Sequence, residues 1–444
     1  MDSPQVLRRI GLMERFHITK AFLGLDTVIL ASAQYTTQDG TVLTPDILFP
    51  ALRNLIESQA PLGLQTMGDE ATANVSWVRL PSVDLSQVVE FSGERELADA
   101  YESQLARPIK TQTALPLWRV EVLADNTLIF ANHHAICDGE SLLSFHMLLF
   151  RALQETSTST SVDASPVVMV PDTTLLIPPV EQLVDVRPSF LRTVQELYEH
   201  FAPASWRPAR SAWSGHPTPL KAPPQINTHI RFLTLPSAES SQLLAACRAH
   251  GATITSVLYV LAINVLSRLL QSDPSIRYKR IAAITAISLR GAANLPREAI
   301  IDYPSSRTTY PRLDPIFSWA DAARESRELA SMKTSAAKTV GMLRWLFGQY
   351  VPFMQEKLGT RREAGFTMSN IGRFETPDVK GRWSVGRTVF AQSDVIVGHA
   401  LAFSLTGDPS GALNFSFGWT DSSVDTPFVE QFIEGLREAI LEII

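Results

Sequence analysis

A mostly apolar run in the first half of the chain ends in two adjacent histidines, and this feature most constrains the fold. Residues 127–131 form the run, and His133 and His134 follow after one asparagine. Asp138 lies four residues beyond the second histidine, and Gly139 comes next. Burying an ionisable ring costs free energy unless the ring is hydrogen-bonded, so two such rings at the end of a buried strand need a reason to be there. The pattern therefore favours a functional segment at the end of a buried strand.

The elements around this segment follow from hydrophobic spacing and turn residues. Residues 117–123 and 127–133 are two strand-like runs separated by a short polar turn, which predicts a β-hairpin. Asp138 suits the N-cap of a helix whose apolar residues continue at helical spacing to Leu153. Successive strand side chains point to opposite faces, so only one of the two histidines can face a given cavity.

The chain has 444 residues, which is too long for one ordinary core. We expect a first lobe over residues 1–165 and a second over residues 226–444. Residues 166–225 form a proline-rich crossover or linker, because 11 of the 28 prolines fall between residues 166 and 224. One amphipathic helix is expected within it, over residues 190–201. Strands, hairpins and helices are mixed in both lobes, so the predicted fold class is α/β (mixed α+β).

Composition excludes several classes of function. The net charge of −6, without a basic tract, argues against nucleic acid as a partner. Cys137 and Cys247 fit a reducing compartment, and we expect a cytoplasmic protein. No transmembrane segment is expected, because the longest apolar stretch, residues 257–270, is interrupted by Asn264 and Arg268.

Three readings of the histidine segment are open from these residues. His133 and His134 can be hydrogen-bonded strand-end residues, with Asp138 as a helix cap and Gly139 in a tight turn. A metal site is disfavoured, because the two rings point to opposite faces and no third ligand follows at a recognised spacing, so we expect no metal. In the third reading the ring that faces a cavity acts as a general base, since imidazole titrates near neutral pH.

Residues 130–141, with the sequence FANHHAICDGES, resemble the HxxxD segment of the chloramphenicol acetyltransferase-like acyltransferase superfamily, and most closely its fungal alcohol acetyltransferases. Residues 287–290 (ISLR) resemble its strand that ends in a Leu-Arg pair. Residues 367–372 (TMSNIG) resemble the Ser-Asn-x-Gly turn of its condensation-type members. Residues 415–420 lack the Asp and the last Gly of the plant-branch signature, so we expect an ordinary final strand there.

This resemblance implies two lobes, each a mixed sheet flanked by helices, with an active-site tunnel between them. It implies an acyl-CoA-dependent O-acyltransferase of secondary metabolism, in the first instance an acetyltransferase, acting on a hydrophobic alcohol. Acetyl-CoA would be a cosubstrate, with no permanently bound cofactor, and the protein is expected to be a monomer. The alternative is a stand-alone condensation-type enzyme that takes its acyl group from a carrier protein and forms an ester or amide. A noncatalytic binding relative is the third hypothesis.

The resemblance also implies roles for single residues. His134 would be the general base, without a covalent acyl-enzyme, while His133 and Gly139 support the segment. Arg290 follows an apolar strand, and a buried guanidinium needs a partner, so we expect an Asp138–Arg290 ion pair. The alternative is that Asp138 only caps a helix and that Arg290 reaches solvent.

Other residues have weaker signals. Ser369 and Asn370 are candidates to donate hydrogen bonds to a tetrahedral oxyanion, beside the alternative of a plain turn. Cys137 is expected to pack under the histidine segment rather than to act as a nucleophile. Residues 428–444 form a predicted amphipathic helix that packs on the second lobe, with peripheral membrane contact as the alternative.

Overall fold

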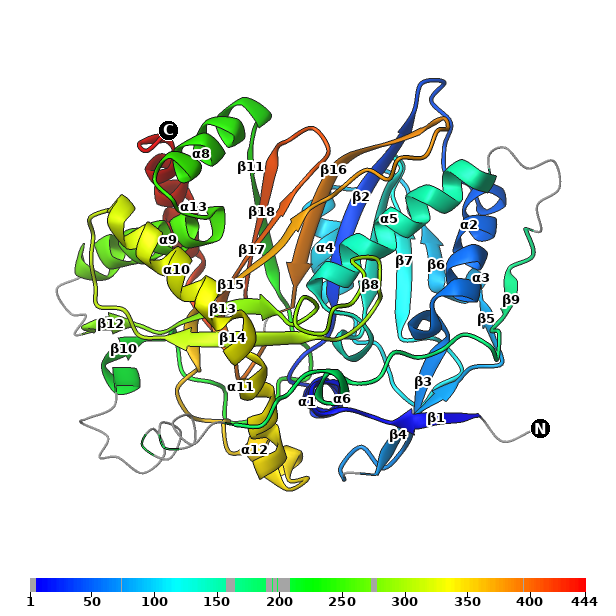
Figure 1. Cartoon of the computed structure of the whole chain (residues 1–444), viewed down its shortest axis with the longest axis horizontal. Coiled ribbons are helices and arrows are strands. Elements are labelled where there is room, and N and C mark those ends of the chain that lie inside the picture. Colours follow the sequence, from blue (N-terminus) through cyan, green and yellow to red (C-terminus); the bar gives the residue numbers. More distant parts are fainter. Residues whose placement is uncertain are drawn as a thin grey trace.

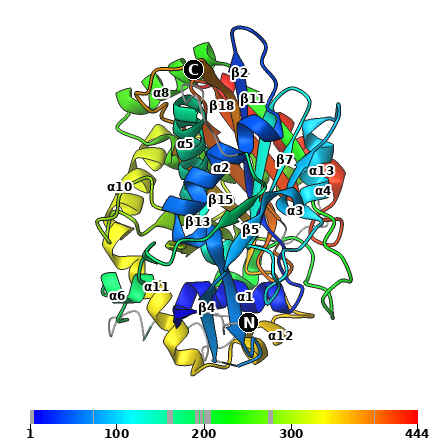
Figure 2. The ribbon, with the colours of Figure 1, turned by 90° about the vertical axis from the view of Figure 1, so that its right-hand side faces the viewer.

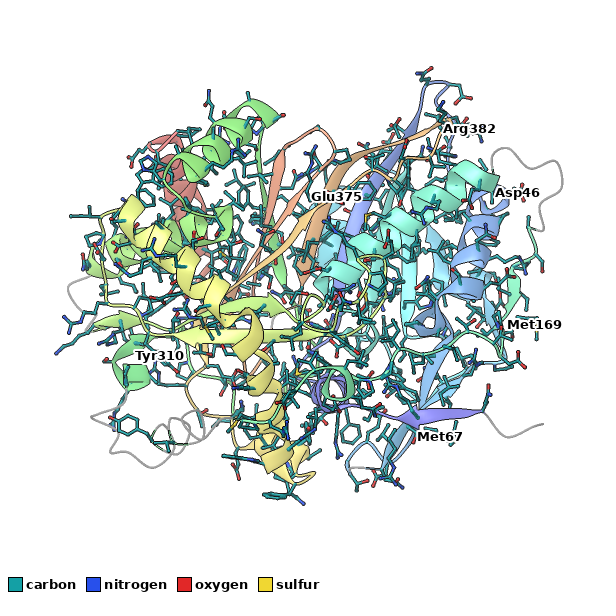
Figure 3. All side chains as sticks on the ribbon, viewed as in Figure 1. Asp46, Met67, Met169, Tyr310, Glu375 and Arg382 are labelled. Carbon is teal, nitrogen blue, oxygen red and sulfur yellow. The ribbon has the colours of Figure 1, made fainter. Side chains whose placement is uncertain are left out.

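The computed structural model describes residues 5–72, 74–156, 164–188, 194, 198, 208–272, 278–393 and 395–444. Two mixed sheets form two lobes, with helices packed on them (Figure 1). Figure 2 shows α5 and α10 on one side of the strands and α4 and α13 on the other. Side chains fill the space between these layers (Figure 3). The predicted two-lobed mixed fold is therefore confirmed.

The first lobe contains a five-stranded sheet in the order β16-β2-β8-β7-β6, in which β6 and β7 are parallel and the other neighbours antiparallel. Its strands are β2 (Ile29–Thr37), β6 (Val89–Phe91), β7 (Trp118–Val122), β8 (Thr127–Asn132) and β16 (Trp383–Gln392). The predicted hairpin is confirmed as β7 and β8, with Val120 opposite Phe130. Every residue of β8 is buried, so the histidine segment directly follows a core strand.

The second lobe contains a six-stranded sheet in the order β11-β18-β17-β15-β13-β14, with β13, β15 and β17 parallel. Its strands are β11 (His229–Leu235), β13 (Ala283–Ser288), β14 (Pro304–Thr309), β15 (Ala364–Arg373), β17 (His399–Gly407) and β18 (Leu413–Trp419). The final strand expected at residues 415–420 is β18. The carboxyl end of β13 leads directly to Arg290.

The remaining strands form three small sheets. They comprise β1 (Val6–Arg9), β3 (Leu64–Gly68) and β4 (Val75–Arg79), then β5 (Ser82–Asp84) with β9 (Val167–Met169), and β10 (Ala212–Trp213) with β12 (Arg280–Ile281). The expected helix over residues 190–201 falls largely outside the described residues.

The helices cover the sheets with apolar faces. They are α1 (Leu12–Phe22), α2 (Pro45–Ser58), α3 (Leu85–Val88), α4 (Leu97–Leu105), α5 (Gly139–Thr156), α6 (Val180–Leu183), α8 (Ser237–Ala249), α9 (Ile254–Ser272), α10 (Trp319–Ser335), α11 (Ala337–Gly341), α12 (Tyr350–Gln355) and α13 (Thr426–Leu441). The 3₁₀ turns are η1 (Ala60–Gly63), η2 (His134–Ile136), η4 (Pro208–Ser211) and η5 (Met342–Leu346). Helix α5 buries Leu142, Phe145 and Leu149, which continues the spacing expected after Asp138.

Among the described residues one helix, α9, is long and apolar enough to cross a membrane by composition. Of its most apolar window, 72% is buried inside the protein. It packs against α10 and α13 in the second lobe, as a core helix does.

Strand β16 ties the lobes together, because residues from the last quarter of the chain complete the first lobe's sheet. It runs antiparallel to β2, with Phe390 opposite Ala31. Its chain neighbours, β15 and β17, belong to the second sheet. Figure 1 shows β16 beside β2. The two sheets are therefore built from interleaved parts of the sequence.

A buried ion pair joins the histidine segment to the second lobe. Arg290 Nη2 lies 2.7 Å from Asp138 Oδ1, and the two side chains are only 5% and 6% exposed. Asp138 also caps α5, because Oδ1 accepts a hydrogen bond from Ser141 N at 2.9 Å. Arg290 Nη1 donates to Ala299 O at 2.6 Å, and Nη2 also contacts Ser141 Oγ. Burial alone would raise the pKa of Asp138, but the Arg290 guanidinium holds it below its ordinary value.

Replacing Asp138 with Ala is expected to destabilise the protein by about 3–5 kcal/mol, because it leaves the Arg290 charge buried without its partner. Urea unfolding followed by fluorescence measures the effect. Asp84→Ala is the matched control: Asp84 accepts from Ser86 N as the cap of α3, and it forms no ion pair within the part of the chain that the structure describes. Loss of a cap costs about 0.5–2 kcal/mol. Equal destabilisation of the two variants would contradict a structural role for the pair.

Candidate active site

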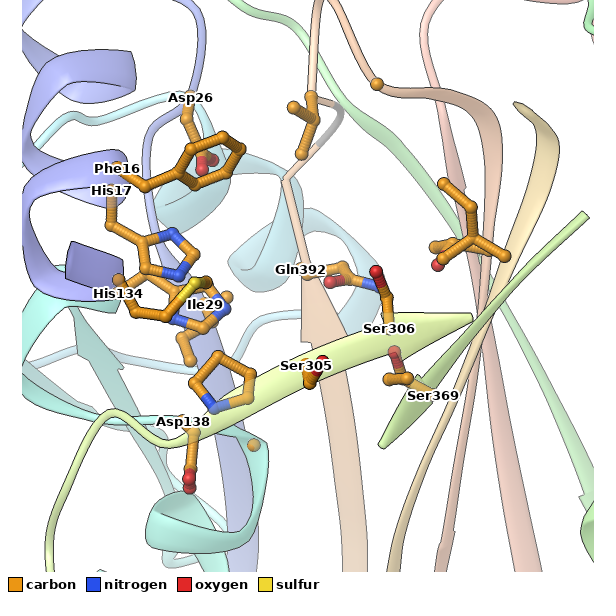
Figure 4. A pocket seen from close by; sticks show the side chains of 18 of the residues that line it. Phe16, His17, Asp26, Ile29, His134, Asp138, Ser305, Ser306, Ser369 and Gln392 are labelled. Atoms are coloured by element: carbon orange, nitrogen blue, oxygen red, sulfur yellow. The ribbon is translucent and has the colours of Figure 1, made fainter. Parts of the chain in front are cut away.

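A cavity of about 330 Å³ lies between the lobes (Figure 4). The first lobe contributes α1, the ends of β2 and β16, and the histidine segment, and the second contributes β13, β14, β15 and α11. A continuous tunnel through the molecule stays a prediction. The cavity is where substrates would meet the histidine segment.

The two histidines of the motif separate at the end of β8. His133 caps η2, since Ala135 N donates to His133 Nδ1 at 3.1 Å, and the residue is 1% exposed. Burial lowers the pKa of His133 to about 4. His134 begins η2 and lines the cavity, with its side chain 19% exposed. Of the two rings, His134 is the one that a substrate can reach.

Two side chains beside His134 were not anticipated from the sequence. Asp302, just before β14, places Oδ1 3.4 Å from His134 Nδ1. The same oxygen lies 3.6 Å from Nε2 of His17, on α1. The His17 and His134 rings are stacked, with centroids 3.7 Å apart and planes at 6°, and Figure 4 shows them face to face. His17 and His134 therefore line the cavity, and the fully buried carboxyl group of Asp302 lies beside both rings.

Burial dominates the electrostatics of this cluster. The Asp302 side chain is fully buried, and burial raises its pKa to about 7 although His134 acts in the opposite direction. Burial, followed by the proximity of His134 and Lys20, holds the pKa of His17 well below its ordinary value. His17 therefore remains neutral near pH 7, and Asp302 changes charge in that range.

The cluster has the ligand types of a metal site but not its geometry. One atom from each of His17, His134 and Asp302 lies within 4.8 Å of the others. Imidazole binds zinc through a lone pair in the ring plane, at about 2.0–2.1 Å. Two parallel rings stacked face to face have no point common to both planes, so one ion cannot lie along both lone pairs. This arrangement fits proton chemistry better than metal binding.

The remaining residues of the histidine segment support it from behind. In Figure 4 the Asp138 side chain points away from the two rings. Its carboxylate is paired with Arg290. A Cβ added to Gly139 would lie 2.6 Å from Ile371 Cγ2, so the close approach of β15 requires glycine. Cys137 is fully buried, and burial raises its pKa well above the ordinary value, which fits packing under the segment.

Ser369 and Asn370 both line the cavity, but they differ in their hydrogen bonds. Asn370 Nδ2 donates to Thr255 Oγ1 at 3.0 Å, and its Oδ1 accepts from Gly372 N at 2.9 Å. No side-chain bond of Ser369 is observed among the described residues. The Ser-Asn-x-Gly turn expected here is wrong: β15 continues to Arg373 because it pairs in parallel with β17. Ser369 is therefore the freer donor.

Gln392 is a further cavity residue that the sequence did not reveal. It ends β16, and its Nε2 is buried without a hydrogen-bond partner in the described part of the chain. Ser306 and Ser369 line the same cavity (Figure 4). An acceptor atom of a ligand would satisfy this amide.

Sequence matches agree with this geometry. The alcohol acetyltransferase family model matches residues 80–280, which include the histidine segment. A probable alcohol acetyltransferase of Fusarium pseudograminearum is 26% identical over 397 residues, covering 82% of this chain and 80% of the relative. Another of Aspergillus fumigatus is 24% identical over 420 residues, covering 83% of this chain and 84% of that protein.

Solved structures share the fold. The trichothecene 15-O-acetyltransferase from Fusarium sporotrichioides has a TM-score of 0.69 at 13% identity, covering 98% of this chain and 94% of its own. The epimerization domain of the third module of tyrocidine synthetase B has a TM-score of 0.64 at 13% identity, covering 100% of this chain and 97% of its own. The chain is therefore similar in sequence to fungal alcohol acetyltransferases, over a region that includes the histidine segment, and it shares the fold of an acetyltransferase and of an epimerization domain.

Proposed function

We propose that the protein transfers an acyl group, in the simplest case acetyl, from the thioester of an acyl-CoA to the hydroxyl of a hydrophobic small molecule. The observation that carries this proposal is that His134, within the matched family region, lines a cavity formed by both lobes. The names of the two fungal relatives support an alcohol as acceptor. Acyl-CoA enters as a substrate, and this chemistry needs no permanently bound cofactor.

His134 acts as the general base in this proposal. Its Nε2 removes the proton of the acceptor hydroxyl as the oxygen bonds to the thioester carbonyl carbon. The tetrahedral intermediate then expels the thiolate, which takes the proton back from the imidazolium. No covalent acyl-enzyme is needed, because the thioester is already activated. Such acid–base catalysis contributes about 10²- to 10⁴-fold to the rate.

The lining of the cavity supports a hydrophobic acceptor. Apolar side chains come from both lobes and include Met13, Phe16, Ile29, Ile287, Val340 and Phe390. Burying an acceptor against them releases about 25 cal/mol per Å² of apolar surface. Ser369 is the proposed hydrogen-bond donor to the oxyanion. It lines the cavity and, unlike the amide of Asn370, its side chain has no hydrogen-bond partner among the residues that the structure describes.

We also propose that the protein is a cytoplasmic monomer. Cys137 and Cys247 are both free thiols, which fits a reducing compartment. Residues of both lobes of one chain line the cavity, so no second copy is required to form it.

Purified protein incubated with acetyl-CoA and a panel of terpene and aliphatic alcohols tests the reaction. We expect acceptor-dependent release of free CoA thiol, together with an ester product detected by mass spectrometry. Acetyl bound to a carrier protein is tested in parallel, with alcohols and amines as acceptors. Transfer from the carrier alone would support the condensation-type alternative and contradict the use of acyl-CoA.

Replacing His134 with Ala is expected to lower kcat by about 10²- to 10⁴-fold, because the base is lost. Circular dichroism checks that the variant folds, and thiol release measures kcat. His250→Ala is a suitable control, since His250 stacks on Trp319 away from the cavity. Thiol release at the wild-type rate in His134→Ala would remove this residue from the mechanism.

Replacing Ser369 with Ala is expected to lower kcat by about 10²- to 10³-fold with little change in KM, as for loss of an oxyanion donor. Ser404→Ala is the matched control. Ser404 pairs with Ser369 across β15 and β17, is 1% exposed and does not line the cavity. Similar kinetics of the two variants would contradict the assignment of Ser369.

A further inference from the structure

We infer that Asp302 is a positioning residue for His134, whose carboxylate holds the imidazole with Nδ1–H toward itself and Nε2 toward the substrate. This inference rests on the proposed function, in which His134 is the base. It assigns a task to an acid that lies outside the HxxxD segment, 168 positions beyond His134 (302 − 134). The resulting pair follows the general logic of a base oriented by a third group.

The first support is the mutual lack of other partners. Both carboxylate oxygens of Asp302, and Nδ1 of His134, are buried without a hydrogen bond to any other described residue. The 3.4 Å between Oδ1 and Nδ1 is longer than a normal hydrogen bond. Such bonds in unliganded sites are often long and shorten when substrate binds. The ring is 19% exposed although Nδ1 is buried, so its exposed part lies away from Asp302.

The second support is the way the backbone holds Asp302 in place. Asp138 N donates to the carbonyl of Ile301 at 2.8 Å, and Tyr303 N donates to Asp138 Oδ2 at 3.2 Å. Asp138 thus binds the residues on both sides of Asp302. The acid of the HxxxD segment therefore fixes the backbone that presents the second acid to His134. This linkage explains how a side chain that points away from the cavity contributes to its chemistry.

The third support is that, of the two imidazoles beside Asp302, only that of His134 is available to take up a proton. His17 lies 3.6 Å from the same oxygen, but its burial and its neighbours keep it neutral. Two imidazolium rings stacked at 3.7 Å would repel each other, so at most one of the two rings is an imidazolium at any time. His17 then serves as a flat support for the His134 ring, while Asp302 stabilises the imidazolium that forms during transfer.

The pH dependence of the reaction follows from the same contacts. Titratable groups close to Asp302 come from α1 and from the histidine segment: Glu14, His17, His134, Cys137 and Asp138. Burial raises the pKa of Asp302 to about 7. Below that pH a protonated Asp302 donates to Nδ1, which moves the proton of neutral His134 onto Nε2. Nε2 then cannot accept a proton from the substrate, so kcat/KM should fall as pH decreases through this range.

Asp302→Asn tests the inference. Its amide donates to Nδ1 and favours the wrong tautomer, which costs about 10⁴-fold in a serine protease triad. We expect kcat to fall about 10²- to 10⁴-fold, KM to change less than about threefold, and the acid limb of the pH profile to move. The melting temperature at pH 8 should be equal or higher, because a buried charge is removed. Asp408→Asn is the matched control, since Asp408 is a buried acid hydrogen-bonded to Asn414 outside the cavity.

A second readout separates this inference from the proposed function. Nitrogen-15 NMR of histidine-labelled protein at pH 8, assigned with His134→Gln, reports the tautomer without turnover. We expect the proton on Nδ1 in wild type and on Nε2 in Asp302→Asn. An unchanged tautomer, an unchanged acid limb, or kcat within threefold of wild type would overturn the inference. A tautomer change in a protein that transfers no acyl group would support the pairing and overturn the proposed function. Loss of activity with EDTA that zinc restores would instead identify the cluster as a metal site.

Discussion

The buried pair between Asp138 and Arg290 is the contact on which the arrangement of the active site depends. It connects the start of α5 in the first lobe to the end of β13 in the second, where both side chains are almost fully buried. Desolvating two charges is costly, so such a pair is retained for geometry more readily than for stability. Here it fixes the segment that leads to β14, and with it the position of Asp302. The histidine and its proposed partner are thereby held from opposite lobes.

The part of the site that is contiguous in sequence could be predicted, because its signals are local. An apolar run that leads to His133 and His134, followed by a capping Asp138, corresponds to β8, η2 and the start of α5. Gly139 could also be anticipated, although its cause is the close approach of Ile371. The expected turn at Ser369 was wrong because pairing with β17 continues the strand despite Gly372, which adopts a φ of 87° beside an irregularity in the pairing.

Asp302 and His17 could not be found in this way, since 285 positions separate them (302 − 17) and neither lies in a motif. A signal for Asp302 did exist: it is a lone acid after the apolar residues 299–301, where a charge is costly. His17 lies in a mixed polar helix and carries no such signal. Only the folded chain shows that α1 and the segment before β14 meet at His134. Residues contributed by distant elements are thus the part of an active site that local patterns miss.

Strand β16 follows β15 of the second lobe in the sequence but pairs in the sheet of the first lobe, and this affects folding during synthesis. The first lobe's strand β2 gains its edge partner 346 positions after Thr37, the last residue of β2 (383 − 37). At a synthesis rate of about 5–20 residues per second, that edge stays open for roughly 20–70 s on the ribosome. An unpaired apolar strand is a template for association with other chains. The sheet of the first lobe therefore remains incomplete during synthesis. A chain that terminates before residue 383 retains that open edge permanently.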